Sequence, residues 1–217
     1  TSTVADMLGR QTVFHYDELG RVVQVVDPLG NFTTTAYDPN GNVATRTDQL
    51  GRTTTDEYDA LNRLIRTIDP NGGITQTVYD ASGNRIATKD PLGNETTYSY
   101  DSVGRLIATT DPLNRTTQTV YDAYGRRSAT IDAAGRQTTY VCDLLDRVIE
   151  VVDPAGSSTY TTYDALGNVL TRTDANGNTT TTTYDVLNRP YITTDANNNS
   201  VTNTYDAAGN LISVTDE

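Results

Sequence analysis

Tryptophan is absent from this 217-residue chain, and phenylalanine occurs only twice. Hydrophobic residues make up 35% of the sequence, against about 45–50% in ordinary soluble domains. The chain therefore has little material for a large buried core. Its large side chains are mostly tyrosines, of which there are 14, and threonine is the commonest residue of all. Because β-branched and aromatic residues favour extended backbone, this composition predicts strands.

Positive charge is also scarce. The chain has 16 Lys and Arg against 28 Asp and Glu, a formal charge of −12. Binding to a phosphate backbone depends on clustered Lys and Arg, so nucleic acid is not expected as a partner. No apolar run approaches the length of a membrane span, and no charged start followed by an apolar stretch indicates a signal peptide.

Cysteine and histidine occur once each, as Cys142 and His15. A single cysteine excludes an internal disulfide, and this pair alone cannot form a zinc site of the usual Cys and His type. We therefore expect no metal and no cofactor to hold the fold together.

A Tyr-Asp pair recurs every 21 residues, and Cys142-Asp143 fills the one place where the tyrosine is missing. A second aspartate divides each repeat into steps of 11 and 10, as Asp27 and Asp38 illustrate. A fixed period of this length indicates a repeat protein, and residues 1–217 are interpreted as a single array of about ten repeats with both ends uncapped. The tyrosines predicted to be structural repeat residues are Tyr16, Tyr37, Tyr58, Tyr79, Tyr100, Tyr121, Tyr163, Tyr184 and Tyr205.

Most periodic aspartates begin a segment of the form Asp-x-x-Gly, such as Asp27 to Gly30 and Asp38 to Gly41. Aspartate at the first position of a turn accepts backbone N–H groups, and glycine takes the left-handed conformation at the end. This combination is the three-residue hairpin loop with a bulge, which suits antiparallel strands. Non-glycine residues predicted to adopt positive φ at this place are Asn62, Asn114, Asp146, Asn188 and Asn198.

The segments between turns have the length and composition of strands, for example 31–37 and 105–110. The predicted fold class is all-β: a continuous antiparallel meander of 21-residue hairpin repeats, curled into a spiral tube or hollow shell wall. A parallel β-solenoid with one coil per repeat is the rival architecture. Tyrosines two strands apart would lie about 9.6 Å from one another, so intervening side chains must bridge them.

The motif resembles that of the YD-repeat, or Rhs-repeat, proteins. It runs Tyr-Asp-x-x-Gly-Arg/Asn, then a strand, then Asp-Pro-x-Gly, as in residues 16–21 leading to 27–30. The resemblance extends over the whole chain. The family includes bacterial Rhs and wall-associated polymorphic toxins, insecticidal toxin-complex subunits and teneurins. It implies a spiralling β-sheet shell that often encloses cargo. The self-cleaving region and toxic tail of the bacterial members match no residues here.

An active site would have to come from residues that break the repeat. Cys142 has no basic sequence neighbour to activate it, so a packed neutral thiol is expected. Asp56 and Glu57 are adjacent on a strand and should point to opposite faces as solvated charges. We therefore expect no enzyme activity and no catalytic residues. The departures from the repeat are His15, Asp56, Glu57, Lys89, Glu95, Tyr124, Cys142, Asp146 and Glu150.

Calcium is a further possibility, because Asp38-x-Asn40-x-Asn42 and Asp174-x-Asn176-x-Asn178 place oxygen ligands at alternating positions. The Asp-x-x-Gly turn explains the same residues without a metal. Arginines recur just after the turns, where they can pair with turn aspartates. Such surface pairs contribute about 0–1 kcal/mol each.

Three functions remain open at this stage. The first is a non-enzymatic wall segment of an extracellular or cell-surface shell that encloses cargo such as a toxin, joined to flanking domains of a longer chain. The second is a filament subunit in which copies pair end to end through open sheet edges. The third is a module that binds glycans or a cell surface through exposed tyrosines.

Overall fold

The spacing of the turn aspartates sets the lengths of the strands. The computed structural model describes residues 1–216 and contains no helix among them. The chain forms two units, residues 1–114 and a second that begins at Arg115. The first unit contains β1 (Ser2–Ala5), β2 (Gln11–Tyr16), β3 (Val22–Val26), β4 (Phe32–Tyr37), β5 (Val43–Thr47), β6 (Thr53–Tyr58), β7 (Leu64–Ile68), β8 (Ile74–Tyr79), β9 (Arg85–Lys89), β10 (Glu95–Tyr100) and β11 (Leu106–Thr110). The second contains β12 (Thr116–Tyr121), β13 (Arg127–Ile131), β14 (Gln137–Cys142), β15 (Val148–Val152), β16 (Ser158–Tyr163), β17 (Val169–Thr173), β18 (Thr179–Tyr184), β19 (Pro190–Thr194), β20 (Ser200–Tyr205) and β21 (Leu211–Asp216).

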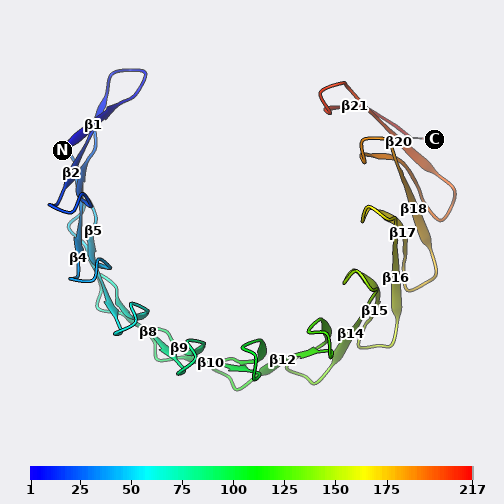
Figure 1. The fold of residues 1–217 in the computed structure, drawn as a ribbon, viewed down its shortest axis with the longest axis horizontal. Coiled ribbons are helices and arrows are strands. Elements are labelled where there is room, and N and C mark those ends of the chain that lie inside the picture. The colour runs from blue at the N-terminus through cyan, green and yellow to red at the C-terminus, as the bar shows by residue number, and fades with distance from the viewer. Residues whose placement is uncertain (217) are drawn as a thin grey trace. The chain divides into compact units, whose positions relative to one another are not determined.

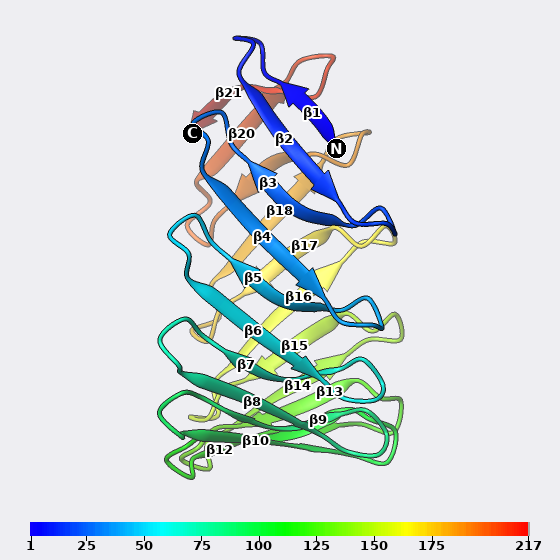
Figure 2. The ribbon, with the colours of Figure 1, turned by 90° about the vertical axis from the view of Figure 1, so that its left-hand side faces the viewer.

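Within each unit, every strand pairs antiparallel with the strand that follows it in sequence. The pairs run from β1 to β11 in the first unit and from β12 to β21 in the second. Figure 2 shows β2 to β8 side by side, with their turns along two edges. The predicted all-β antiparallel meander is therefore confirmed, and the parallel solenoid is excluded.

Long and short strands alternate, and the strand that follows each long strand carries a bulge opposite the tyrosine. Even-numbered strands have six residues, and the odd-numbered strands from β3 to β19 have five. In the hairpin of β4 and β5, Tyr37 pairs with Val43 but Ala36 pairs with Thr45, so the register shifts by one residue beside the tyrosine. The same shift occurs in the other hairpins that follow a long strand, and the return pairing, as in β3 with β4, has none. The sequence signature predicted a hairpin bulge; the structure places it beside the tyrosine.

Two kinds of turn result from this alternation. We call the turn that follows a long strand a tyrosine turn and the other an intervening turn; because the strands are antiparallel, the two kinds lie along opposite edges of each unit. In the tyrosine turn at Asp38, the Gly41 N–H donates to the Asp38 carbonyl oxygen at 3.0 Å. Gly30 and Gly41 have φ of 85° and 92°. The predicted positive φ is also confirmed, at 60° to 67°, for Asn62, Asn114, Asp146, Asn188 and Asn198.

Replacement of Gly41 by valine is expected to destabilise its hairpin. A left-handed conformation costs an L-residue roughly 1–2 kcal/mol and a β-branched residue at least that much. The added Cβ would meet only Arg21 Nη1 at 3.6 Å, so backbone conformation and not crowding is the cause. Thermal unfolding of Gly41→Val against Gly41→Asn measures it. Equal melting temperatures for both variants and the parent chain would contradict the turn geometry.

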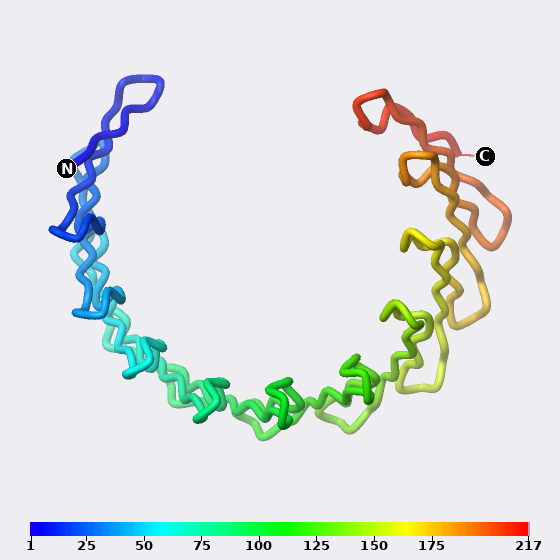
Figure 3. Tube along the Cα trace, viewed as in Figure 1, coloured from blue at the N-terminus to red at the C-terminus, as the bar shows by residue number. Residues whose placement is uncertain are grey.

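Very little of either unit is buried. Among the described residues, Ala87 at 8% exposure and Ala129 at 4% are the only buried apolar side chains. The sheet is a single layer with threonines on both faces, and Figures 1 and 3 show that the strip of each unit is bent. Large apolar residues such as Leu29 and Leu61 sit exposed at turn tips. A hydrophobic core therefore does not hold these units together, and the stabilising contacts must be sought elsewhere.

No helix capable of crossing a bilayer is found in the part of the chain that the structure describes.

Candidate functional site

Each turn is clamped by the carboxylate of its first aspartate. At Asp59, Oδ1 accepts the backbone N–H groups of Leu61 at 2.9 Å and Arg63 at 3.0 Å, and Oδ2 accepts Arg63 Nε at 2.7 Å. Asparagine performs the same task at Asp38, whose Oδ2 accepts Asn42 Nδ2 at 2.9 Å. Arg or Asn occupies the position four residues after the aspartate in every turn except those at Asp69 and Asp153, and both side chains offer an N–H donor of suitable reach.

These hydrogen bonds favour the ionised carboxylates. The backbone N–H of Arg63, followed by its side chain, lowers the pKa of Asp59 below its ordinary value. The side-chain amide of Asn42 is the main cause that lowers the pKa of Asp38. Most turn aspartates of both units are lowered in the same way, including Asp6, Asp27, Asp48, Asp174 and Asp206.

Acid is therefore expected to destabilise the fold. A carboxylate whose pKa is lower in the folded state stabilises that state above its unfolded pKa, about 3.9 for aspartate, and the contribution disappears as pH falls through the folded pKa. The melting temperature should hold steady above about pH 5 and decline below about pH 4. Circular dichroism melts from pH 7 to pH 2, at low and high salt, measure this. A melting temperature that is constant or rising down to pH 2 would refute the expectation.

The repeat tyrosines join the long strands to the short strands that precede them. Their hydroxyls donate to the carbonyl oxygen 15 residues earlier, which begins the neighbouring short strand. The bonds are Tyr37 to Val22 at 2.9 Å, Tyr58 to Val43 at 3.1 Å, Tyr100 to Arg85 at 2.8 Å, Tyr163 to Val148 at 2.9 Å, Tyr184 to Val169 at 3.0 Å and Tyr205 to Pro190 at 2.9 Å.

Where a tyrosine turn carries an arginine, the arginine side chain fills the space between successive tyrosines. The Arg147 guanidinium lies over the ring of Tyr163 at 4.7 Å, and its Nη1 donates to the Asp164 carbonyl oxygen of the next tyrosine turn at 2.8 Å. Equivalent stacks place Arg21 over Tyr37 at 4.3 Å and Arg63 over Tyr79 at 4.5 Å. In these repeats, the bridging predicted from the strand spacing is thus made by arginine. We call this repeated set of contacts the tyrosine ladder.

The ion pairs within the two kinds of turn differ in exposure. In the tyrosine turn at Asp59, the ion pair of Arg63 and Asp59 is 2.7 Å long with side chains 27% and 21% exposed. In the intervening turn at Asp48, the equivalent pair with Arg52 has side chains 62% and 39% exposed. The ion pair of the tyrosine turn is therefore the less exposed of the two.

The remaining predicted repeat residues occupy matching places. Tyr16 bonds Ser2 Oγ at 2.8 Å through its hydroxyl, and Tyr79 contacts Arg63. Tyr121 ends β12 as the others end their strands. Asp27 clamps its turn through Leu29 N at 2.8 Å. That these residues determine stability remains a prediction, which the variants described below test.

The degenerate repeat at Cys142 interrupts the ladder. With no tyrosine ring there, the Arg126 guanidinium lies 5.0 Å from the exposed ring of Tyr124. Arg126 Nη1 still donates to the Asp143 carbonyl oxygen at 2.9 Å and approaches Asp146 at 3.4 Å. Cys142 itself is half-buried and free.

Replacement of Cys142 by tyrosine is expected to stabilise the second unit by about 1 kcal/mol, as restoration of a repeat consensus does. Strand β10 shows that the ring fits, because it carries Tyr98 and Tyr100 where β14 carries Tyr140 and Cys142. The Cys142→Phe variant separates the ring from its hydroxyl. Chemical denaturation of both compares them with the parent chain, and a lower stability of Cys142→Tyr would show that the ladder is not the stabilising feature.

The burial of Asp56 shows that one expectation was wrong. The residue was expected to be a solvated charge, yet it is 7% exposed. Its Oδ2 accepts Arg46 Nη1 at 2.7 Å and its Oδ1 accepts the Thr67 hydroxyl at 2.7 Å. Glu57 faces the other way and pairs with Arg66 at 2.6 Å, as strand alternation predicted. The sequence did not reveal the burial because Arg46 and Thr67 lie on neighbouring strands.

The structure brings no catalytic set together from the residues that break the repeat. His15 Nδ1 lies 3.4 Å from the Thr1 hydroxyl, and Glu150 accepts the Ser158 hydroxyl at 2.9 Å. Within residues 1–216, no three His, Cys, Asp or Glu side chains are grouped to hold a metal ion. At the suggested calcium loop, the carboxylate of Asp174 already accepts the backbone N–H and side-chain amide of Asn178.

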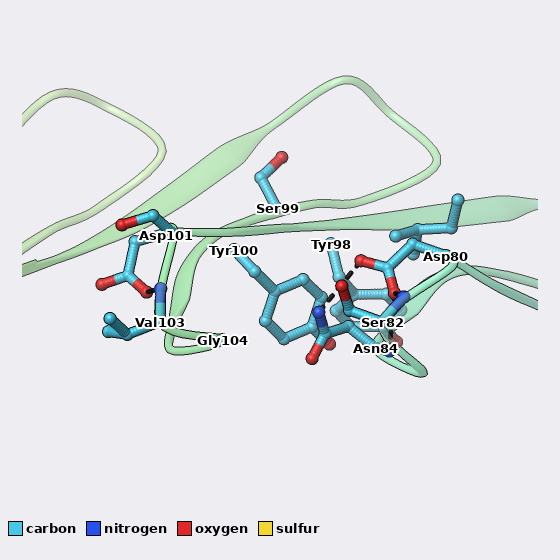
Figure 4. A pocket seen from close by; sticks show the side chains of 11 residues that line it. Asp80, Ser82, Asn84, Tyr98, Ser99, Tyr100, Asp101, Val103 and Gly104 are labelled. Atoms are coloured by element: carbon cyan, nitrogen blue, oxygen red, sulfur yellow. Dashed lines mark hydrogen bonds between the residues drawn. The ribbon is translucent and has the colours of Figure 1, made fainter.

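A hollow of about 690 Å³ opens in the first unit between two tyrosine turns. Figure 4 shows Tyr98 and Tyr100 on one side of β10, beside Asn84, and Ser99 on the opposite side. We call the face to which the repeat tyrosines point the tyrosine face. Arg85 covers the Tyr98 ring at 4.4 Å, and Tyr100 uses its hydroxyl on a backbone carbonyl. The Tyr98 ring is therefore covered on one face, and the Tyr100 hydroxyl is already used within the chain.

Comparison with known proteins agrees with this architecture. The Teneurin YD-shell family matches residues 3–150, and the RHS Repeat family matches residues 163–199. No curated protein matches the chain significantly. A crystal structure of TcdB2-TccC3 without its hypervariable C-terminal region matches 95% of the chain at 20% identity, with a TM-score of 0.59. A structure of the Photorhabdus luminescens Tc holotoxin pore matches 95% at 15% identity, with a TM-score of 0.42.

The chain spans 14% of the length of the first of these structures and 18% of the second. At 20% identity, the likeness to TcdB2-TccC3 supports the fold alone. The family match covers more than half of the chain and includes the turns, bulged hairpins and tyrosine ladder of the first unit. The chain is a structural repeat segment, and it belongs to the Teneurin YD-shell family.

Proposed function

We propose that this chain is a non-enzymatic wall segment of a hollow β-sheet shell that encloses cargo such as a toxin outside the cell. The observation that carries the proposal is the single-layer sheet, in which Ala87 and Ala129 are the only buried apolar side chains of the described residues. Such a sheet separates two aqueous spaces without a core of its own. Family membership supports the same role.

Contacts between the turns of neighbouring repeats suit the wall of a shell. In repeat proteins each repeat contacts only its neighbours, so stability accumulates along the array. The tyrosine ladder supplies that contact from one tyrosine turn to the next and leaves both faces hydrophilic. The wall can therefore be lengthened by adding repeats without building a new core.

The partners that follow from this role are flanking domains of a longer chain and the enclosed cargo. The chain spans only a small share of the solved structures it resembles. We infer that the two units form one continuous array of repeats within a larger shell. Family membership supports a location of that shell outside the cell or at its surface.

Electron microscopy of the purified chain across a concentration series tests the wall against the filament. Discrete curved particles with the mass of one chain, unchanged by concentration, are expected for a wall segment. Uniform fibres that lengthen with concentration would overturn the proposal in favour of end-to-end strand pairing between copies. Detection of the native protein only in the cytoplasm of its source cells would refute the extracellular setting.

A further inference from the structure

Arg172 is a cation without a partner on the tyrosine face of the second unit. It lies on β17, pairs in register with Thr161 and Thr180, and is exposed. The structure gives it no hydrogen bond, ion pair or ring contact within the described residues. The other arginines near it behave differently, since Arg147 and Arg189 are both clamped by turn aspartates.

The first unit contains the same position with its partner present. Arg46 and Arg172 are six repeats apart, and the neighbours of one match the neighbours of the other. Arg46 pairs in register with Thr54, as Arg172 pairs with Thr180, and Asp56 pairs with Thr67, as Thr182 pairs with Thr193. The only change among these positions is threonine in place of the aspartate.

The carboxylate of Asp56 shows what this arrangement of donors holds. It accepts Arg46 Nη1 and the Thr67 hydroxyl, both at 2.7 Å, and it is 7% exposed. In the other repeats this arginine position carries valine or threonine, as at Val25 and Thr88. Arginine is therefore a departure from the repeat, and in the first unit a carboxylate accompanies it.

A cavity occupies the corresponding place in the second unit. It has a volume of about 350 Å³ and is lined by Arg172, Thr180, Thr182, Tyr184, Thr193 and two further residues. The Tyr184 hydroxyl is already committed to the Val169 carbonyl oxygen at 3.0 Å. Arg172 and the hydroxyls of Thr180, Thr182 and Thr193 are the polar groups left to line the cavity, and of these Thr182 and Thr193 occupy the places of Asp56 and Thr67. Guanidinium and hydroxyl donors together suit a planar carboxylate.

We propose that Arg172, Thr182 and Thr193 form a binding site for a carboxylate, supplied by a small organic acid or by an Asp or Glu side chain of another polypeptide. The ligand occupies the place that the Asp56 carboxylate fills in the first unit. The site does not depend on the shell proposal, since it requires only the local strand register of β17 to β19.

Acetate is the first probe. In protein labelled with ¹⁵N-arginine, the Nε–H resonance of Arg172, identified by its loss in Arg172→Gln, is expected to shift saturably with sodium acetate. Sodium chloride of equal ionic strength should leave it unchanged. The Arg46 resonance should not respond to acetate, because Asp56 occupies its partner position. A response that is linear with acetate, absent, or equal at Arg46 and Arg172 would overturn the proposal.

Two exchanged variants provide matched controls. Thr182→Asp supplies the carboxylate within the chain and is expected to weaken the acetate response of Arg172 about tenfold or more. Asp56→Thr empties the equivalent place and should make Arg46 respond to acetate. Far-UV circular dichroism verifies folding, and if Asp56→Thr fails to fold, Thr182→Asp still decides. An undiminished response in Thr182→Asp would contradict the site.

A peptide identifies the source of the carboxylate. A short peptide of serine and threonine with one central glutamate is titrated beside its glutamine twin. Binding of the glutamate peptide more tightly than acetate supports a polypeptide ligand, and equal binding supports a small organic acid. Equal binding of the glutamate peptide and its glutamine twin would overturn carboxylate recognition.

Discussion

Deletion of residues 59–79 is expected to leave a protein that unfolds cooperatively within a few degrees of the parent, whereas deletion of residues 59–68 lowers the melting temperature by roughly 5–15 °C. The first deletion removes one long and one short strand and joins Tyr58 to Asp80. The second removes one short strand and its turn and joins Tyr58 to Asp69. Both junctions preserve an intact Asp-x-x-Gly turn.

The difference follows from the two edges of the sheet. Neighbouring antiparallel strands end at opposite edges, so loss of a single strand sends Tyr79 to the edge opposite Tyr58. Tyr79 then loses the arginine that covers its ring, and two six-residue strands become direct neighbours. Loss of a complete 21-residue repeat keeps every later tyrosine on its own edge.

Thermal unfolding by circular dichroism compares the two deletions. Each repeat contacts only the repeats beside it, so deletion of one complete repeat should change the melting temperature little. Equal melting temperatures for both deletions would show that the ladder and the two-strand alternation contribute nothing. Greater loss from the 21-residue deletion would contradict the repeat unit itself.

Replacement of Tyr163 by alanine is expected to cost about 2–4 kcal/mol in the free energy of unfolding. The ring is half-buried beneath Arg147, and the hydroxyl donates to the Val148 carbonyl oxygen at 2.9 Å. Tyr163→Phe keeps the ring and removes only the hydrogen bond, so its expected cost is about 1 kcal/mol. The alanine variant removes both interactions.

Tyr160 offers a matched control on the same strand. It lies three residues before Tyr163 in β16 and is 47% exposed, with no part in the ladder. Tyr160→Ala is expected to cost less than about 1 kcal/mol. Urea denaturation of the three variants gives the comparison. A cost for Tyr160→Ala as large as that for Tyr163→Ala would mean that ring area, and not the ladder, sets stability.

Local features of the fold were predictable from the sequence. The turn at Asp38 requires only a carboxylate, its neighbouring N–H groups and a residue that accepts positive φ, all within five residues. The same reasoning identified Asn62 as a left-handed residue, with φ of 61°. Strand lengths then follow from the intervals between turns.

Contacts across strands were harder to predict. The bulge beside Tyr37 and its hydroxyl bond to Val22 depend on register, which one sequence does not display. Burial of Asp56 depends on Arg46 and Thr67 from two neighbouring strands. The frequent occurrence of Arg or Asn four residues after the turn aspartates was the available signal for the clamp, and the side-chain geometry of the clamp emerges only from the folded turn.

Oxidative cross-linking of engineered cysteines most directly tests the antiparallel meander and its register. Thr162 and Thr171 are paired, with hydroxyl oxygens 2.7 Å apart. In a Cys142→Ser background, Thr162→Cys with Thr171→Cys should form a disulfide readily, because paired residues of adjacent strands lie about 4.5–5.5 Å apart at Cα. Thr162→Cys with Thr183→Cys, two strands apart at about 9.6 Å, should not. Efficient cross-linking of the second pair and none of the first would indicate stacked parallel coils and contradict the account.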